Sequence, residues 1–262
     1  IDRIKKKYHP SQNDIESMQN PYNYMINREF INEEDEFPSV QCFKSAIDFL
    51  DLNKNADDWF LQIETFDPHE PFFAPERLKE RFKTNYKGPI LDWPRYNRVN
   101  EDQEHIDEIR ANYMALLSLC DELLGKLLDY FDEHDLWKDT ALIVGTDHGF
   151  LLGEHDWWAK NRMPLYEEIS HIPLFFYHPK FMKLGGERRT SLTQTIDLMP
   201  TFLDLYDAPI PDEVQGYSLI PILKKDTTQR SAGMFGYWGG GINIADGQYT
   251  YFCYPNDMLN QD

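Results

Sequence analysis

The sequence predicts an α/β domain that ends in a small antiparallel β layer. Three observations lead to this class. Residues 101–134 repeat apolar side chains every three or four positions, the period of an amphipathic helix. The run TALIVGT at 140–146 is short, apolar and β-branched, as expected for a buried parallel strand. Strands and helices then alternate until a glycine-rich tail, and 262 residues suffice for such a domain.

The first hundred residues contain one clear helical segment between less regular stretches. Residues 1–38 are polar, contain several prolines and show no sustained period, so we interpret them as a surface loop. Residues 39–53 place apolar side chains at spacings of three and four, which predicts a helix. Residues 59–66 are predicted to form a buried strand. Five prolines in the stretch 68–100 favour an irregular excursion.

The last hundred residues continue the alternation and then change character. We predict a buried strand at 172–177 and a helix at 195–206. Residues 234–254 contain a glycine run and an Asp-Gly turn between apolar stretches, which predicts an antiparallel hairpin. We therefore expect a main domain over 1–230 and the start of a small antiparallel subdomain over 231–262.

Composition excludes several classes of partner. The net charge of −19 would repel nucleic acid and an anionic membrane surface, so neither is expected as a partner. The sequence has no signal-like start and no apolar run near ~18 residues, so we expect no membrane anchor. Cys42, Cys120 and Cys253 are far apart and form no CxxC motif, which favours a reducing compartment such as the cytoplasm. A lost signal peptide would change that expectation of localisation.

Asp147, His148 and Gly149 directly follow the strand predicted at 140–146. Ligands gather at the carboxyl ends of strands in open α/β sheets. A carboxylate and an imidazole on adjacent residues can bind one divalent cation, and a glycine allows a sharp turn behind them. A turn with a hydrogen-bonded aspartate and a surface histidine fits these three residues equally well.

The longer run TDHGFLLGEHDWWAKNRMPLYEE favours the metal site over the simple turn, because it resembles the signature of the sulfatase family within the alkaline phosphatase superfamily. The resemblance implies that Asp147 and His148 are metal ligands and that Lys160 binds the sulfate group. A lysine ammonium can neutralise a sulfuryl oxygen and the charge that grows on the leaving group. The alternative is an ordinary surface lysine, which its neighbours Trp157 and Trp158 disfavour.

A second match is FLQIETFDPHEPF, which resembles the H-x-P-F pattern of the same family. The resemblance implies that His69 donates a hydrogen bond to the sulfate ester, and that either His69 or Lys160 is the general acid that protonates the leaving alcohol. Histidine suits this task because its unperturbed pKa is near ~6.5. The alternative is a loop histidine held by the neighbouring Asp67 or Glu70.

The resemblance covers roughly residues 39–253. It implies a mixed sheet flanked by helices, whose first strands we expect to lie upstream of this sequence. That upstream part carries two metal-binding aspartates and a C-x-P-S-R-like motif, whose cysteine or serine becomes formylglycine. None of the three cysteines here lies in such a motif. We therefore expect the nucleophile upstream and this chain by itself to be inactive.

The resemblance implies metal-dependent hydrolysis of a sulfate monoester by the full-length protein, with a small-molecule or carbohydrate sulfate ester as substrate. Ca²⁺ is the expected metal, and the nitrogen of His148 makes Mn²⁺ an alternative. Two other functions stay open. The protein could be a phosphonate monoester or phosphodiester hydrolase of the same superfamily, or a non-catalytic fragment or pseudoenzyme that binds an anion or a partner.

Overall fold

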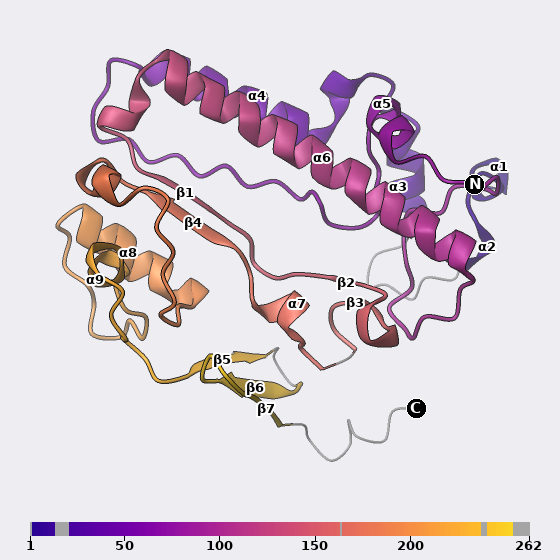
Figure 1. Cartoon of the computed structure of the whole chain (residues 1–262). Helices are drawn as coiled ribbons and strands as arrows, with labels where there is room; N and C mark the ends of the chain where they lie inside the picture. Colours follow the sequence, from indigo (N-terminus) through magenta and orange to yellow (C-terminus); the bar gives the residue numbers. More distant parts are fainter. Residues whose placement is uncertain (1, 14–20, 163, 237–239, 254–262) are drawn as a thin grey trace. The chain divides into compact units, whose positions relative to one another are not determined.

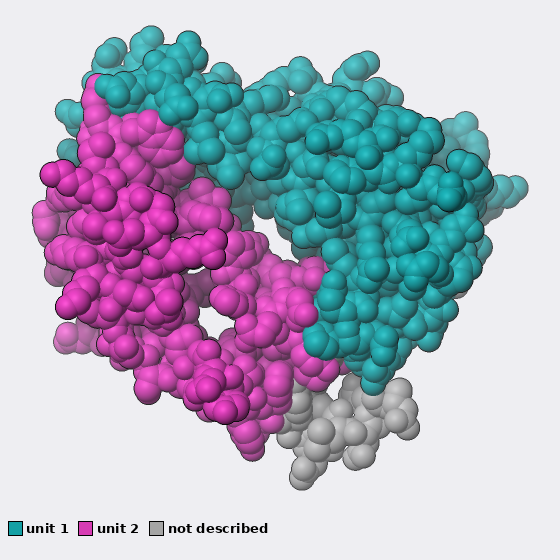
Figure 2. All heavy atoms as spheres, viewed as in Figure 1, with its two compact units in different colours: residues 1–136, 151–159 teal, residues 137–150, 160–262 magenta. Residues whose placement is uncertain are grey.

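The computed structural model describes residues 2–13, 21–162, 164–236 and 240–253 (Figure 1). The chain divides into two compact units: unit 1 contains residues 1–136 and 151–159, and unit 2 contains residues 137–150 and 160–262 (Figure 2). Within the described ranges, no helix is both long enough and apolar enough to cross a membrane.

The helices and strands of unit 1 are α1 (Asp2–Lys5), α2 (Pro10–Asn13), α3 (Pro21–Arg28), η1 (Glu34–Glu36), α4 (Pro38–Asn53), α5 (Glu76–Lys79), η2 (Glu80–Phe82), α6 (Gln103–Glu133), β2 (Leu151–Leu152), η4 (Glu154–Asp156) and β3 (Trp158–Ala159). Those of unit 2 are β1 (Leu142–Gly145), α7 (Glu167–Ser170), β4 (Leu174–Tyr177), η5 (Pro179–Leu184), η6 (Thr195–Asp197), α8 (Leu198–Leu205), α9 (Ile220–Lys224), β5 (Gly233–Gly236), β6 (Ile242–Ala245) and β7 (Thr250–Cys253). The short η3 (Leu136–Lys138) lies where the chain passes from unit 1 to unit 2.

The long helix α6 supplies much of the core of unit 1. Its apolar stripe is buried, as Ile109, Leu116 and Leu123 illustrate. The carboxylate of Asp102 accepts a hydrogen bond from the backbone N–H of His105 at 3.1 Å, which satisfies one of the free amides at the start of the helix. Helix α4 packs along α6 (Figure 1). Both helices predicted from apolar spacing are confirmed.

The prediction that residues 1–38 form a surface loop is wrong. Helices α1, α2 and α3 form there, and Met25 is buried. At the end of α3, Arg28 forms an ion pair with Asp92 in which only 9% and 2% of the two side chains are exposed. Gln12 donates to the same carboxylate at 3.1 Å. Helices of four to eight residues are too short to show a period, and packing against other elements stabilises them.

The strand predicted at 59–66 is also wrong as a strand. The segment is extended, but within the described parts of the chain no strand pairs with it. Its side chains still alternate between half-buried and exposed, with Phe60 and Phe66 exposed by 56% and 74%. The alternating pattern sets the backbone conformation, whereas a strand also needs a hydrogen-bonded partner. The irregular excursion predicted for 68–100 is confirmed, apart from the short α5 and η2.

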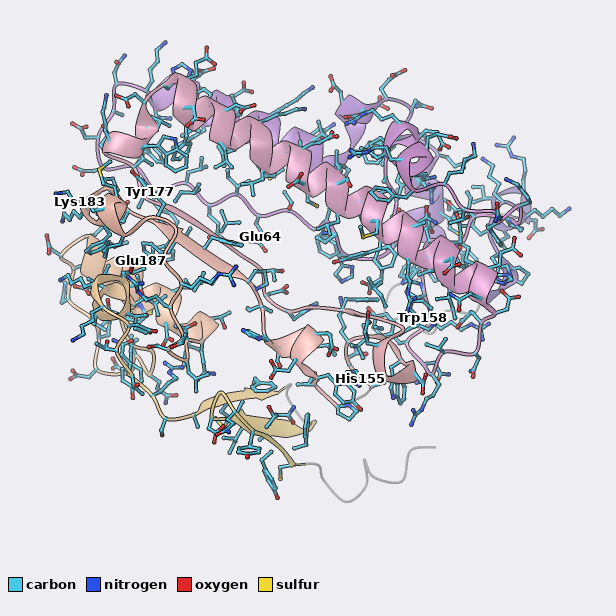
Figure 3. All side chains as sticks on the ribbon, viewed as in Figure 1. Glu64, His155, Trp158, Tyr177, Lys183 and Glu187 are labelled. Carbon is cyan, nitrogen blue, oxygen red and sulfur yellow. The ribbon has the colours of Figure 1, made fainter. Side chains whose placement is uncertain are left out.

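A small hairpin of β2 and β3 closes unit 1 and leads to Lys160. Trp158 on β3 is fully buried (Figure 3), and its indole N–H donates to Glu101 at 2.8 Å. His155 and Ala159 have φ angles of 55° and 79°, in the left-handed region that favours glycine. The burial of Trp158 and its hydrogen bond to Glu101 hold the hairpin in unit 1.

In unit 2, β1 and β4 form a two-stranded antiparallel sheet. The strands predicted at 140–146 and 172–177 exist, but the parallel pairing and the full burial are wrong, since Phe175 is 68% exposed. A short apolar run does not reveal the direction of its partner, which depends on distant sequence. The hydroxyl of Tyr177 (Figure 3) donates to the carbonyl of Trp137 at 2.5 Å, which ties β4 to the start of the unit.

The C-terminal part of unit 2 follows the sequence predictions. The helix predicted at 195–206 is confirmed as η6 followed by α8. The hairpin is confirmed as the antiparallel sheet β5–β6–β7, although residues 237–239 and 254 of the predicted hairpin lie outside the described residues. This sheet belongs to the same compact unit as residues 160–230, and the domain boundary at 231 stays a prediction. The α/β class is confirmed.

Candidate functional site

Asp147 and His148 follow the end of β1 in unit 2, and their side chains lie together. Asp147 Oδ1 accepts a hydrogen bond from the His148 backbone N–H at 2.9 Å, and Asp147 Oδ2 is 3.5 Å from His148 Nε2. The side chains are 83% and 39% exposed, so both reach solvent. The two residues predicted to be metal ligands are therefore side by side and accessible.

The hydrogen bonds of His148 decide which of its nitrogens can accept a ligand. Nδ1 is 2.9 Å from the carbonyl oxygen of Gly149, which can only accept, so Nδ1 carries the proton. In the neutral ring Nε2 is then an acceptor, and it faces a carboxylate oxygen of Asp147. Two acceptors that face each other repel unless a proton or a cation lies between them. The pair is thus arranged to hold a positive charge.

Gly149 has no room for a side chain. Its N–H donates to the carbonyl of Ile169 at 2.8 Å, and an added Cβ would lie 1.8 Å from the carbonyl oxygen of Glu168. This close approach between the Asp147–His148 turn and helix α7 requires glycine because backbone atoms cannot move aside as a flexible side chain can. Gly149 therefore sets the direction of the loop that carries the pair.

We expect Gly149→Ala to lower the free energy of unfolding of the 262-residue chain by about 2–3 kcal/mol, because α7 must shift to admit the methyl group. Urea unfolding followed by circular dichroism measures this change. The matched control is Gly125→Ala in α6, where an added Cβ meets nothing within 4 Å and should stabilise by up to about 1 kcal/mol. Unchanged stability in Gly149→Ala would show that this backbone contact is absent.

Lys160 lies directly after β3, and its ammonium is 5.8 Å from the centre of the Phe150 ring. That distance is within the range of a cation–π interaction. Phe150 is two residues after His148, so the contact places Lys160 beside the Asp147–His148 loop within unit 2. Lys160 is half-buried, in contrast to the exposed Lys183 of the same unit (Figure 3).

His69 belongs to unit 1, and its imidazole is held by its neighbours. Nδ1 is 2.6 Å from the carbonyl oxygen of Glu70 and 3.3 Å from the carboxylate of the same residue. The ring lies against Phe66, with 4.6 Å between ring centres, and 32% of the side chain is exposed. Glu70 therefore holds His69, as the sequence allowed. Asp67 accepts a hydrogen bond from Ser39, and its charge also interacts with that of the His69 ring.

The structure places Asp147 beside His148, and Lys160 against the ring of Phe150. Across the described part of the chain, no group of three or more His, Cys, Asp or Glu side chains is placed to hold a metal ion. Phe150 was missed by sequence reasoning, although its place within the signature was a usable signal. Burial raises the pKa of the Cys120 thiol to about 12, so it stays protonated near neutral pH and is a poor nucleophile.

Comparison with known proteins shows which proteins this chain resembles. N-acetylglucosamine-6-O-sulfatase of Bacteroides thetaiotaomicron is 32% identical over 151 residues, which are 58% of this chain and 25% of the relative. A protein solved in complex with its substrate D-glucosamine-2-N,6-O-disulfate superposes with a TM-score of 0.66 and 19% identity, covering 84% of this chain and 61% of that one. Phosphonate monoester hydrolase of Agrobacterium radiobacter gives 0.69 and 20%, covering 85% and 53%.

These comparisons differ in what they support. At 19% and 20% identity the two solved structures support the fold alone. The chain spans less than two thirds of the length of each of the three proteins. The model of the family described as Sulfatase matches residues 7–208, most of this sequence, and agrees with the resemblance carried by the signature motif. The chain therefore belongs to the sulfatase family.

Proposed function

We propose that the protein containing this chain hydrolyses sulfate monoesters, with Asp147 and His148 as metal ligands, Lys160 as the sulfate-binding cation and His69 as the proton donor. The observation that supports this most directly is the pairing of Asp147 and His148, whose acceptor atoms face each other 3.5 Å apart. The membership of the chain in the sulfatase family supports the same reaction.

The donor atoms of Asp147 and His148 fit a single divalent cation. Asp147 Oδ2 and His148 Nε2 lie 3.5 Å apart, so a single divalent cation could be held by both. Such an ion supplies Lewis-acid polarisation of the ester when bound. Ca²⁺ comes first because it prefers oxygen donors, and the imidazole nitrogen makes Mn²⁺ the alternative. The remaining ligands come from other parts of the protein.

Lys160 and His69 have complementary tasks in this proposal. The ammonium of Lys160 neutralises an oxygen of the sulfuryl group and the charge that develops as the ester bond breaks. With Nδ1 of His69 bonded to a carbonyl oxygen, Nε2 is the nitrogen that would give a proton to the leaving alcohol. The attacking group in this proposal is a formylglycine hydrate, and no cysteine or serine of these 262 residues lies in a C/S-x-P/A-x-R motif that would supply it.

A sulfated sugar is the substrate class that we favour. The Bacteroides relative is named for the 6-O-sulfate of N-acetylglucosamine, and it shares 32% identity with this chain over the aligned region. A second candidate activity is hydrolysis of phosphonate monoesters, because a hydrolase of that class has the same fold. Sulfate and phosphonate esters present similar anionic oxygens to a lysine and a metal ion, so one site could serve both.

The test uses the longer protein that contains this chain. We expect it to hydrolyse an aryl sulfate with a higher kcat/KM than the matched aryl phosphonate, and to release sulfate from N-acetylglucosamine 6-sulfate. Lys160→Ala should lower kcat/KM for the sulfates by about 10²–10³-fold. The control is Lys183→Ala, an exposed lysine of the same unit, which should leave it unchanged.

A strong preference for the phosphonate would select the second candidate. Absence of turnover on every ester, together with binding of sulfate ion that Lys160→Ala abolishes, would identify a non-catalytic anion-binding protein. Equal activity of Lys160→Ala and Lys183→Ala would reject the role given to Lys160. The three outcomes test separately whether the protein is an enzyme, whether it prefers sulfate or phosphonate esters, and whether Lys160 takes part.

A further inference from the structure

Glu70 is a buried carboxylate next to the proposed proton donor. Only 1% of its side chain is exposed, whereas 32% of the His69 side chain is exposed. One carboxylate oxygen, Oε2, is 3.3 Å from His69 Nδ1, and the backbone carbonyl of Glu70 is 2.6 Å from the same nitrogen. Buried carboxylates are uncommon without a specific role because loss of hydration disfavours the charge. The backbone carbonyl oxygen and Oε2 of Glu70 therefore both face the same ring nitrogen.

Tyr96 fixes the carboxylate from the other side. Its hydroxyl donates a hydrogen bond to Glu70 Oε1, while Oε2 is the oxygen nearest His69. The residue after Tyr96 is itself anchored, since the carbonyl of Asn97 accepts a hydrogen bond from the N–H of Trp158 at 3.0 Å. Tyr96, Glu70 and His69 thus form a chain of contacts that leads from the buried β3 to the accessible imidazole.

These contacts determine which nitrogen of the His69 ring carries a proton. Because both groups that face Nδ1 are acceptors, Nδ1 carries a proton in either charge state of the ring. A general acid must also carry a proton on Nε2, so the ring must be an imidazolium before it donates. A carboxylate about 3–4 Å away favours the imidazolium over the neutral ring.

We propose that Glu70, held by Tyr96, is a positioning residue that keeps Nδ1 of His69 protonated and supports its imidazolium form. This inference rests on the proposed function, in which His69 protonates the leaving alcohol. Glu70 touches no reacting atom and acts only through His69. During the reaction sulfur forms a bond to the attacking oxygen as its bond to the ester oxygen breaks, the proton on Nε2 passes to that departing ester oxygen, and the neutral ring retains its Nδ1 proton.

The first experiment compares leaving groups in the longer protein. Loss of acid assistance slows esters of poor leaving groups most, because 4-nitrophenolate departs readily without a proton. We expect Glu70→Gln to lower kcat/KM about 10–100-fold for an alkyl sulfate and less than about threefold for 4-nitrophenyl sulfate. Tyr96→Phe should act in the same direction with a smaller effect. The matched control is Glu76→Gln, a nearby glutamate whose side chain is 77% exposed.

A double-mutant cycle separates positioning from a general structural role. In a His69→Ala background, Glu70→Gln should cause no further loss on the alkyl sulfate, because its effect passes through the missing imidazole. An equal loss on both esters, or an additive loss in the His69→Ala background, would overturn the assignment. If the wild-type protein hydrolyses no sulfate at all, the proposed function fails instead.

The second experiment needs no activity and uses the 262-residue chain. Nitrogen chemical shifts of the His69 ring, assigned with the His69→Gln variant, should show the neutral tautomer with its proton on Nδ1. In Glu70→Gln a larger fraction of the neutral ring should carry its proton on Nε2 than in wild type, while Glu76→Gln leaves the tautomer unchanged. A neutral ring protonated on Nε2 in wild type, or a tautomer that is identical in wild type and Glu70→Gln, contradicts the inference whatever the protein catalyses.

Discussion

Asp147→Asn is expected to lower kcat/KM of the longer protein on a sulfate monoester by at least about 10³-fold, and to reduce its bound divalent ion well below one equivalent. The change keeps the shape of the side chain but removes its charge, so Oδ2 no longer faces Nε2 of His148 as an anionic oxygen. Under the proposed function the effect exceeds the loss of one hydrogen bond, because the Lewis-acid contribution of the ion would be lost together with its ligand.

Elemental analysis of dialysed protein, alongside steady-state kinetics, measures both parts of this expectation. His148→Ala should behave in the same way, since it removes the other donor. Asp212→Asn serves as control, because this exposed aspartate of unit 2 takes no part in the site. Excess Ca²⁺ or Mn²⁺ that restores activity to Asp147→Asn would show weakened binding and identify the preferred metal. Full metal content and full activity in Asp147→Asn would show that Asp147 is not a metal ligand.

Local sequence patterns predicted the elements that form from the spacing of neighbouring residues alone. Helix α6 repeats its apolar residues over 31 positions, so its period can be recognised without knowing which elements pack against it. The adjacency of Asp147 and His148 is likewise a property of the chain itself. The direction of β1 was not predictable, because its antiparallel pairing with β4 depends on residues about thirty positions further along.

The candidate site shows the same difference between features that a short stretch of sequence determines and contacts between distant residues. The signature motif contains Lys160 and the pair of predicted ligands within one short run, so a resemblance could assign all three together. The contact between Glu70 and Tyr96 joins residues 26 positions apart in an irregular stretch, and no sequence period links them. Such contacts follow from the packing of loops, which becomes visible only when the structure is known.

The N-terminal region shows the largest difference between sequence and structure, because a polar segment supplies a buried charge. Arg28 is 9% exposed and pairs with Asp92, and its guanidinium also lies 3.7 Å from the centre of the Phe73 ring. Burial is the largest influence and by itself would lower the pKa of Arg28, but the charges of Asp92, Tyr24 and Tyr8 and the hydrogen bond to Asp92 together outweigh it and raise the pKa. The guanidinium therefore stays charged. The backbone carbonyl of Asp92 accepts from Phe72 at 2.7 Å, so the pair also holds the loop after His69.

Arg28→Ala should therefore lower the free energy of unfolding by about 3–5 kcal/mol, because it leaves Asp92 buried without its cation. The exposed pair of Lys7 and Glu29 is the matched control in the same helical region: its atoms are 2.5 Å apart and its side chains are 44% and 27% exposed. Lys7→Ala should lower the same quantity by less than about 1 kcal/mol, because water already solvates both charges. Urea unfolding of the 262-residue chain measures both variants.

The double variant Arg28→Met with Asp92→Leu distinguishes the loss of a pair from the loss of packing. Removal of both charges leaves no unpaired ion, so most of the stability lost in Arg28→Ala should return, even though the salt bridge is still absent. If the double variant is as unstable as Arg28→Ala, the aromatic stacking of the guanidinium on Phe73 matters more than its charge. If Arg28→Ala costs no more than Lys7→Ala, Asp92 has access to water and the pair does not organise the N-terminal helices.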